Sequence, residues 1–390
     1  MLSGRCANTA AWHRLGDGKS STETEILMRR LLVALLTLAA MVSVVSRASA
    51  DAPSLRLPPP TGSHPVGSTD LHLVDDARRD PWVPTGSREL MVSMFYPALL
   101  SIGQRRPYLT TAEAKAFLTE SGLPDVDPAR VAGTRSSARV DAPPLPGKRA
   151  LVVLSPGFGK PRTTLTGLAE ELASKGFVVA VIGHNYESHG TAFPDGRVTE
   201  CAACGSDSTL LPPIRSADVS FVLDTLTRGS SKWSWLIDRT RIGMAGHSIG
   251  GYSSPTAMVN DQRIRAGVDM DGRLWSPIPA SGIDRPFLLL GRESEYTPAG
   301  PDTTWAGSWP KLTGWKRWIS VAAAGHASFT DVGVLGEQLG LSKPGLLGGL
   351  RGMELTRAYV SAFFDANLRG GRQPLLDGPV TGNPEIKFWN

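Results

Sequence analysis

Residues 241–259 read RIGMAGHSIGGYSSPTAMV, in which a serine between glycines joins two apolar segments. The first segment (242–245) has the composition of a buried strand, and the second (249–259) that of a helix. Gly246 and Gly250 lie two residues before and after Ser248, where larger side chains would collide in a tight turn. The stretch therefore predicts a strand, a sharp turn that exposes Ser248, and a helix, which is the local setting of a nucleophilic serine.

Further strand and helix patterns alternate on both sides of this stretch. The strand patterns lie at 150–154, 177–182, 266–270, 286–290 and 318–322, and the helix patterns at 163–175, 214–226 and 354–368. Before them, 71–75 and 89–96 predict an antiparallel hairpin. The alternation indicates an α/β fold with a mostly parallel sheet and helices on both faces.

The remaining segments suggest how the chain is organised. Residues 51–69 are rich in Pro, Gly and Ser and predict an extended N-terminal arm. Residues 70–390 show no internal repeat and no long linker, so we expect one domain there. Within it, residues 99–148 carry a helical pattern at 111–120 among many Pro and Gly residues, which predicts an insertion at the rim of a pocket.

Residues 1–50 have the features of an export leader. Two arginines precede the apolar run 31–45, and the small-x-small pattern 48–50 precedes Asp51. The run is shorter than the ~20 residues that span a membrane, which favours a cleaved signal peptide over an anchor. A signal peptide that begins at Met28 would have ordinary proportions, so Met28 is a candidate start codon. We expect secretion, with Asp51 as the first residue of the mature chain and no membrane span after cleavage.

The charge of the chain argues against a nucleic-acid partner. The full sequence of 390 residues carries a net charge of +5. The leader holds six basic and three acidic residues, so the mature chain has a net charge of +2. Clustered Lys and Arg that neutralise phosphates supply most non-specific affinity for nucleic acids, and this nearly balanced chain has no such cluster.

The mature chain has two cysteines, Cys201 and Cys204, in the sequence CAAC. In an exported protein such a pair predicts a short disulfide that pins one loop. A thioredoxin-like pair would begin a helix after a strand, and a zinc site would need two further ligands nearby. The sequence around the pair offers neither.

A nucleophilic serine needs a base, and in folds of this kind the chain order is serine, acid, histidine. His326 is the single histidine after Ser248 and follows the strand pattern 318–322, so we expect it to be the base. His247 is adjacent to the serine, where neighbouring side chains diverge, and we expect a structural role for it.

Several carboxylates between the serine and the histidine are candidates for the residue that orients the histidine. Asp271 directly follows the strand 266–270, at the sheet edge where the other two groups emerge, and is the residue we favour. Glu293 and Glu295 follow the next strand and keep a second arrangement open. The other candidates are Asp269 and Asp284.

Attack by a serine on a carbonyl carbon creates an oxyanion that needs two N–H donors. One donor is the residue after the serine, Ile249, and the other lies in the loop after an early strand. The loop SPGFG (155–159) follows the strand 150–154, and its glycines allow it to curl. We therefore expect the N–H groups of Phe158 and Ile249 to form the oxyanion hole.

With these motifs the chain resembles the secreted platelet-activating factor acetylhydrolase family and its bacterial esterase and lipase relatives, over residues 64–370. The shared motifs are PVG near the start, the PGFG loop continuing to Arg162, the GHSIGG turn, the acid after the next strand and GHASFTD around His326. The resemblance implies an α/β-hydrolase fold with Asp271 as the acid. The family's oxyanion loop usually reads His-Gly where this chain has Pro156-Gly157, and the insertion differs, so the family's substrate is not implied.

We therefore expect a secreted, monomeric serine esterase or lipase that acts on small-molecule or lipid esters without a metal or organic cofactor. Its catalytic residues would be Ser248, Asp271 and His326. The GHSIGG turn is also similar to that of cutinase-like polyester hydrolases, which place the acid one strand later. A serine peptidase or amidase, and an inactive binding protein on the same fold, remain alternatives, because a triad does not distinguish esters from amides and a fold does not fix a function.

Overall fold

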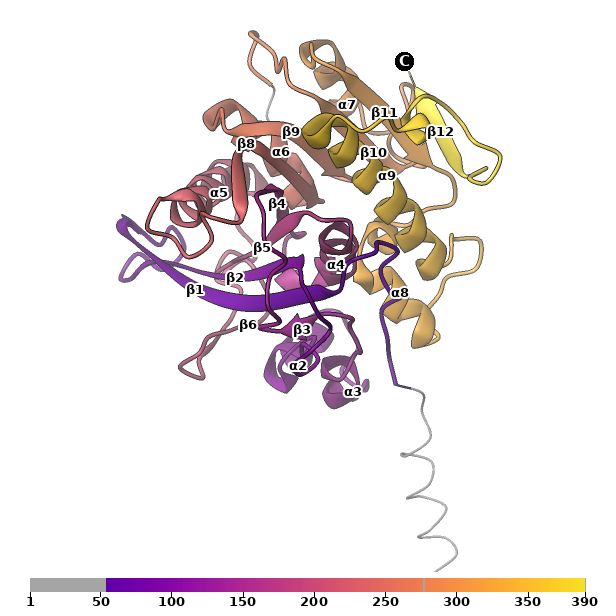
Figure 1. Ribbon diagram of the computed structural model, residues 1–390. Helices are drawn as coiled ribbons and strands as arrows, with labels where there is room; N and C mark the ends of the chain where they lie inside the picture. Colours follow the sequence, from indigo (N-terminus) through magenta and orange to yellow (C-terminus); the bar gives the residue numbers. More distant parts are fainter. Residues whose placement is uncertain (1–53, 276–277, 390) are drawn as a thin grey trace, which may run out of the picture. The chain divides into compact units, whose positions relative to one another are not determined.

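The computed structural model describes residues 54–275 and 278–389, so the expected leader and its cleavage site before Asp51 lie outside the described residues. From Ser54 onward the chain clusters as one compact unit. This unit is built on a ten-stranded sheet with helices against both faces (Figure 1). The strand order is β12-β11-β10-β9-β8-β4-β5-β2-β1-β3.

The middle of the sheet is parallel, and antiparallel strands join it near both ends. β4, β5, β8, β9, β10 and β11 pair in parallel, whereas β2 pairs antiparallel with β5 and with β1, and β12 pairs antiparallel with β11. The strands of this sheet are β1 (Val66–Arg79), β2 (Ser87–Pro97), β3 (Arg139–Val140), β4 (Arg149–Ser155), β5 (Val178–His184), β8 (Ile237–His247), β9 (Ile264–Met270), β10 (Phe287–Arg292), β11 (Lys316–Val321) and β12 (Ile386–Trp389). The expected hairpin and mostly parallel sheet are confirmed.

Helices cover both faces because the central strands are apolar on both sides. Val152 and Leu154 of β4 pack with α4 and α9, whereas Leu151 and Val153 pack with α5 and α6. The helices are α2 (Thr111–Glu120), α3 (Pro128–Ala132), α4 (Thr166–Ser174), α5 (Leu211–Thr227), α6 (Ile249–Asn260), α7 (Thr304–Ser308), α8 (Asp331–Gln338) and α9 (Gly349–Arg369).

The start of the first strand and the last strand of the sheet differ from the sequence-based expectation. The N-terminal arm ends at residue 65, because β1 begins at Val66 and pairs with β2 as far as Pro97. The strand β11 is not the last one, because β12 adds antiparallel to it, with Phe388 opposite Ile319. The expected insertion contains α2, α3 and the short β3.

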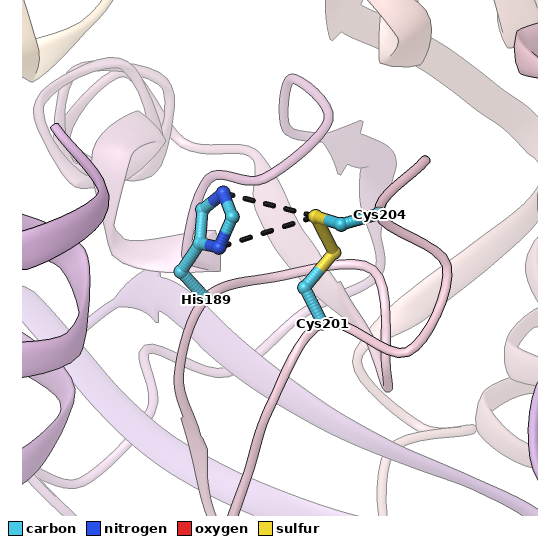
Figure 2. A group of neighbouring side chains, drawn as sticks. All are labelled: His189, Cys201 and Cys204. Carbon is cyan, nitrogen blue, oxygen red and sulfur yellow. Dashed lines mark hydrogen bonds between the residues drawn. A yellow bond between two sulfur atoms is a disulfide. The ribbon is translucent and has the colours of Figure 1, made fainter. Parts of the chain in front are cut away.

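Cys201 and Cys204 are bonded to each other, as the sequence predicted. Cys201 and Cys204 lie between the two-stranded sheet of β6 (Thr191–Ala192) and β7 (Val198–Thr199) and helix α5. His189 faces the bond, with its Nε2 3.8 Å from the sulfur of Cys204 (Figure 2). In the part of the chain that the structure describes, no helix combines the length and the apolar character needed to cross a membrane.

Candidate active site

The expected serine lies at a sharp turn between β8 and α6. Ser248 has φ 56° and ψ −122°, a left-handed conformation that residues other than glycine rarely adopt and that often marks functional sites. A Cβ on Gly246 would lie 2.1 Å from the carbonyl carbon of Gly250, and a Cβ on Gly250 would lie 2.0 Å from Ser155 O. The structure therefore confirms the strand-turn-helix setting and the need for both glycines.

Asp271 and His326 are in direct contact. Asp271 follows β9, is 1% exposed, and shares a hydrogen bond with His326 Nδ1 through one carboxylate oxygen. Its other oxygen accepts the backbone N–H of Arg292 at 2.8 Å. Burial raises the pKa of Asp271, against the opposing effects of His326 and Arg292. Because an ionised carboxylate only accepts, the contact places the imidazole proton on Nδ1 and leaves Nε2 able to accept one.

The two glutamates of the alternative arrangement are engaged elsewhere. Glu293 forms an ion pair with Lys387 of β12. Glu295 lies 3.1 Å from the guanidinium of Arg273. Within the described residues neither carboxylate contacts His326, whereas Asp271 does. The geometry therefore favours the acid that follows β9.

Asp269 shapes the turn that carries Asp271. Its buried carboxylate accepts the backbone N–H of Gly272 at 2.9 Å, and Asp271 takes a φ of 60° in this turn. A Cβ on Gly251 of α6 would lie 1.9 Å from the same carboxylate, so the turn and the helix after Ser248 are closely packed. Asp284, in contrast, has 89% of its side chain exposed.

His247 contacts both the backbone and the ring of His326. His326 begins a single turn (His326–Phe329) after β11, with 43% of its side chain exposed. His247 Nε2 donates to His326 O at 2.8 Å, and the two rings are 4.5 Å apart between centroids. Burial, together with the neighbouring His326, holds the pKa of His247 well below its ordinary value, so it stays neutral. This contact agrees with the structural role expected from the sequence.

Ser248 is held beside the Asp271–His326 pair by its own backbone N–H and by the residue before it, His247. Its backbone N–H donates at 2.9 Å to the carbonyl of Met270, which directly precedes Asp271. His247, which directly precedes Ser248, contacts His326. In the described part of the chain Ser248 Oγ makes no hydrogen bond, so the serine-to-imidazole bond of a complete triad is not formed here. In unliganded enzymes such bonds are often long and shorten when substrate binds.

The expected oxyanion loop lies against the serine. A Cβ on Gly157 would lie 3.5 Å from Ser248 Cβ, so the loop approaches the serine closely. Ile249 is the first residue of α6, and an N–H at that position has no acceptor within its own helix. The loop residues after Phe158 have their N–H groups bonded to Glu187 O and Gly157 O, whereas no acceptor for Phe158 N–H lies among the described residues. Among the described residues the N–H groups of Phe158 and Ile249 therefore have no backbone acceptor, and the loop that carries Phe158 approaches Ser248 at Gly157.

An apolar cavity of about 400 Å³ opens beside His326. Its walls include Phe117 and Leu118 from α2, Leu335 from α8, and Leu346. The expected insertion does line a pocket next to the site. A cavity of this size and character suits the apolar part of a substrate.

Two groups of three potential metal ligands occur among the described residues, each with donor atoms within 4.8 Å of one another. In the first group, the sulfurs of Cys201 and Cys204 are bonded to each other. The second group consists of His247 and the Asp271–His326 pair, which bond one another. The sulfurs of the first group are therefore engaged with each other, and in the second group Asp271 is engaged with His326 Nδ1. Among the described residues His247 Nδ1 has no hydrogen-bond partner.

The fold and this site define the class of the protein. A mostly parallel sheet with a serine at a strand-to-helix turn, an acid after the next strand and a histidine after a later strand is the arrangement of the α/β-hydrolases.

Comparisons with known proteins identify the family. A family model described as platelet-activating factor acetylhydrolase, isoform II, matches residues 127–199. A probable 1-alkyl-2-acetylglycerophosphocholine esterase from Arthroderma benhamiae is 29% identical over 377 residues, 86% of this chain and 94% of that protein. The solved structure of a ferulic acid esterase from Streptomyces cinnamoneus is 41% identical with a TM-score of 0.79, and the match covers 87% of this chain and 100% of that one.

A more distant relative is a bis(hydroxyethyl) terephthalate hydrolase from Streptomyces coelicolor, 25% identical over 190 residues, 40% of this chain and 54% of that protein. The chain belongs to the platelet-activating factor acetylhydrolase family of α/β-hydrolases and is a carboxylic ester hydrolase.

Proposed function

We propose that the protein hydrolyses carboxylic esters through a covalent acyl-enzyme formed on Ser248. The observation that carries this proposal is the contact between Asp271 and His326, next to a serine held at φ 56° in the turn before α6. A partly exposed serine and an imidazole with a fixed proton position suit acyl transfer, in which the same imidazole must accept a proton and later return it.

In the proposed mechanism, Ser248 Oγ attacks the ester carbonyl carbon while His326 Nε2 takes the hydroxyl proton. Asp271 fixes the tautomer of the imidazole and stabilises the imidazolium that forms. The N–H groups of Phe158 and Ile249 bind the oxyanion. The imidazolium then gives its proton to the departing alcohol. A water molecule, deprotonated by the same imidazole, attacks the acyl-enzyme. The imidazolium returns this proton to Ser248 Oγ as the bond to the acyl group breaks, which releases the acid and the free serine.

We propose esters with an apolar part as the substrate class, because the cavity beside His326 is lined largely by apolar side chains. The first candidate is a lipid ester, which the name of the fungal relative, an acetylglycerophosphocholine esterase, supports. The second is an ester of an aromatic acid or a polyester of such acids. It is favoured by the names of the ferulic acid esterase and the terephthalate ester hydrolase.

We also propose that the protein is secreted after cleavage before Asp51. The leader carries the arginine pair, the apolar run and the small-x-small pattern of an export signal. The disulfide between Cys201 and Cys204 supports the same location, because disulfides persist in oxidising compartments and are rare in the cytosol.

A panel of chromogenic and natural substrates tests the reaction and its class. We expect hydrolysis of p-nitrophenyl esters, with a Ser248→Ala variant as the inactive control, and negligible hydrolysis of a matched p-nitroanilide. An acyl series from acetate to palmitate, a methyl ester of a phenolic cinnamic acid and a polyester film then separate the lipid, aromatic-ester and polyester candidates. Comparable turnover of ester and anilide would instead indicate an amidase. Absence of turnover together with absence of fluorophosphonate labelling would indicate an inactive binding protein.

A further inference from the structure

A network of buried charged side chains lies directly behind the oxyanion loop. At its centre is Arg215 of α5, which is 1% exposed. Its Nη1 donates to the carbonyl of Pro156 at 2.5 Å and to Ser155 Oγ at 3.1 Å. Its Nε donates to the carboxylate of Glu187 at 2.7 Å. One guanidinium therefore joins the first two residues of the loop to a buried counter-ion.

The contacts of this network form a closed ring that begins and ends at the oxyanion loop. Glu187 also pairs with Arg88 at 3.3 Å, and Arg88 pairs with Asp218 at 2.6 Å. Asp218 accepts His184 Nδ1 at 2.8 Å, and His184 Nε2 lies 2.9 Å from Ser155 Oγ, which returns the chain of contacts to the loop. All of these side chains belong to residues that are at most 2% exposed. Buried charges with several partners each have one favourable arrangement, so Arg215 is held in a fixed position.

Ser155, His184 and Asp218 are residue types of a catalytic triad, but they do not form a second active site. Their exposures are 0%, 2% and 0%, so no substrate reaches the hydroxyl. Burial and the neighbouring Arg215 lower the pKa of His184, so its imidazole is neutral. The Nδ1–H donates a hydrogen bond to Asp218, which leaves Nε2 without a proton, and Nε2 therefore accepts a hydrogen bond from the Ser155 hydroxyl. The hydroxyl oxygen is then free to accept from Arg215. The trio is part of the support of the loop.

The contact of Arg215 with the loop fixes the peptide that directly precedes the one carrying an expected oxyanion donor. The carbonyl of Pro156 and the N–H of Gly157 lie in one planar peptide, so the bond from Arg215 fixes that plane. The next peptide carries the Phe158 N–H, and its carbonyl, Gly157 O, accepts Lys160 N–H at 3.2 Å. Because N–H and C=O of a trans peptide point in opposite directions, the Phe158 N–H points away from Lys160.

We propose that Arg215 is a positioning residue for ester hydrolysis, which holds the start of the oxyanion loop so that Phe158 N–H faces the oxyanion. The inference rests on the proposed function. Arg215 does not touch the reacting atoms and acts through Pro156. The oxyanion carries its full charge only after attack by Ser248, so a displaced donor lowers kcat rather than raising KM. Deleting an oxyanion donor costs about 10²- to 10³-fold in kcat, and we expect its displacement to cost about 10- to 100-fold.

The test compares Arg215→Lys with a control, Arg78→Gln. Lysine keeps the positive charge beside Glu187 but lacks the guanidinium fork that also reaches Pro156 O. Arg78 contacts the same network, 2.9 Å from Asp218, but does not touch the loop. For each variant we would measure the melting temperature, kcat and KM for p-nitrophenyl acetate, and inhibition by an alkylboronic acid. The tetrahedral boronate adduct of a serine places an oxygen where the oxyanion forms.

We expect kcat of Arg215→Lys to fall about 10- to 100-fold with little change in KM, and boronate affinity to fall by a similar factor. Arg78→Gln should match the wild type in both. If Arg215→Lys does not fold, Glu187→Gln, which keeps the shape but removes the counter-charge, should lower kcat and boronate affinity together. A folded variant of either kind that matches Arg78→Gln in kcat or boronate affinity would overturn the inference. A wild type that does not react with a fluorophosphonate would overturn the proposed function instead.

Discussion

Replacing Asp271 by asparagine reverses the proton position on His326. Asp271 uses its two oxygens differently: one accepts Arg292 N–H at 2.8 Å, and the other faces His326 Nδ1. An amide has one oxygen, and the backbone N–H of Arg292 can only donate, so the amide oxygen faces Arg292 and the NH₂ faces the imidazole. The NH₂ donates, so Nδ1 must accept and the proton moves to Nε2. There it blocks proton transfer from Ser248.

The expected magnitude follows from the loss of this base. In the serine-protease triad the same change lowers kcat by about 10⁴ while the geometry is retained. At about 1.36 kcal/mol per tenfold, this equals about 5.4 kcal/mol of transition-state stabilisation. We expect a similar loss for Asp271→Asn with little change in KM. The fold should be retained, because the amide keeps a partner for each of its two groups at this buried position.

Steady-state hydrolysis of p-nitrophenyl acetate measures this loss, with circular dichroism melting as the check on the fold. Glu293→Gln and Glu295→Gln are the matched controls, because their carboxylates pair with Lys387 and Arg273. Both controls should retain turnover close to that of the wild type. Near wild-type turnover in Asp271→Asn with collapse in either glutamate variant would refute the reasoning. The acid would then follow β10, as in the cutinase-like arrangement.

Four further predictions concern other parts of the chain. Ser248→Ala should lower kcat by about 10⁶ in the same assay, and substantial residual turnover would contradict its role. The double variant Cys201→Ser/Cys204→Ser should retain turnover, because the disulfide lies outside the triad contacts; a folded but inactive variant would contradict this. Mass spectrometry of culture supernatant should identify Asp51 as the first residue, whereas uncleaved protein in the membrane would argue against export. His247 is neutral when folded, but the unfolded chain binds a proton below about pH 6.5, so its contribution to stability is present above that pH and is lost as the pH falls. His247→Gln should reduce this acid destabilisation by up to about 1.4 kcal/mol per pH unit, and equal pH slopes in thermal melts of both proteins would contradict it.

Most of the sheet could be predicted because its central strands are continuous apolar segments. β4 and β5 are buried on both faces, so their sequences contain almost no polar residues and differ sharply from the surrounding loops. β12 could not be predicted in this way. It has four residues, IKFW, after a long segment without a periodic pattern, and it becomes a strand because it pairs with the edge of β11.

The site shows the same division between local and tertiary signals. Ser248 and His326 follow from glycine spacing and chain order, which are local features of the sequence. Asp271 was one of several carboxylates after strands, and the contact with His326 that distinguishes it joins residues 55 positions apart. The support of the oxyanion loop was missed, because Arg215 meets Pro156 from 59 positions away and no local pattern marks a buried ion pair.

The most direct test of an acyl-enzyme on Ser248 is to locate the residue that a fluorophosphonate modifies. The protein is treated with the reagent, digested, and analysed by tandem mass spectrometry, with Ser248→Ala treated in parallel. The proposed mechanism predicts one adduct per chain, on Ser248, and no adduct in the variant. Absence of labelling in the folded wild type, or labelling of another residue such as Ser155, would contradict it.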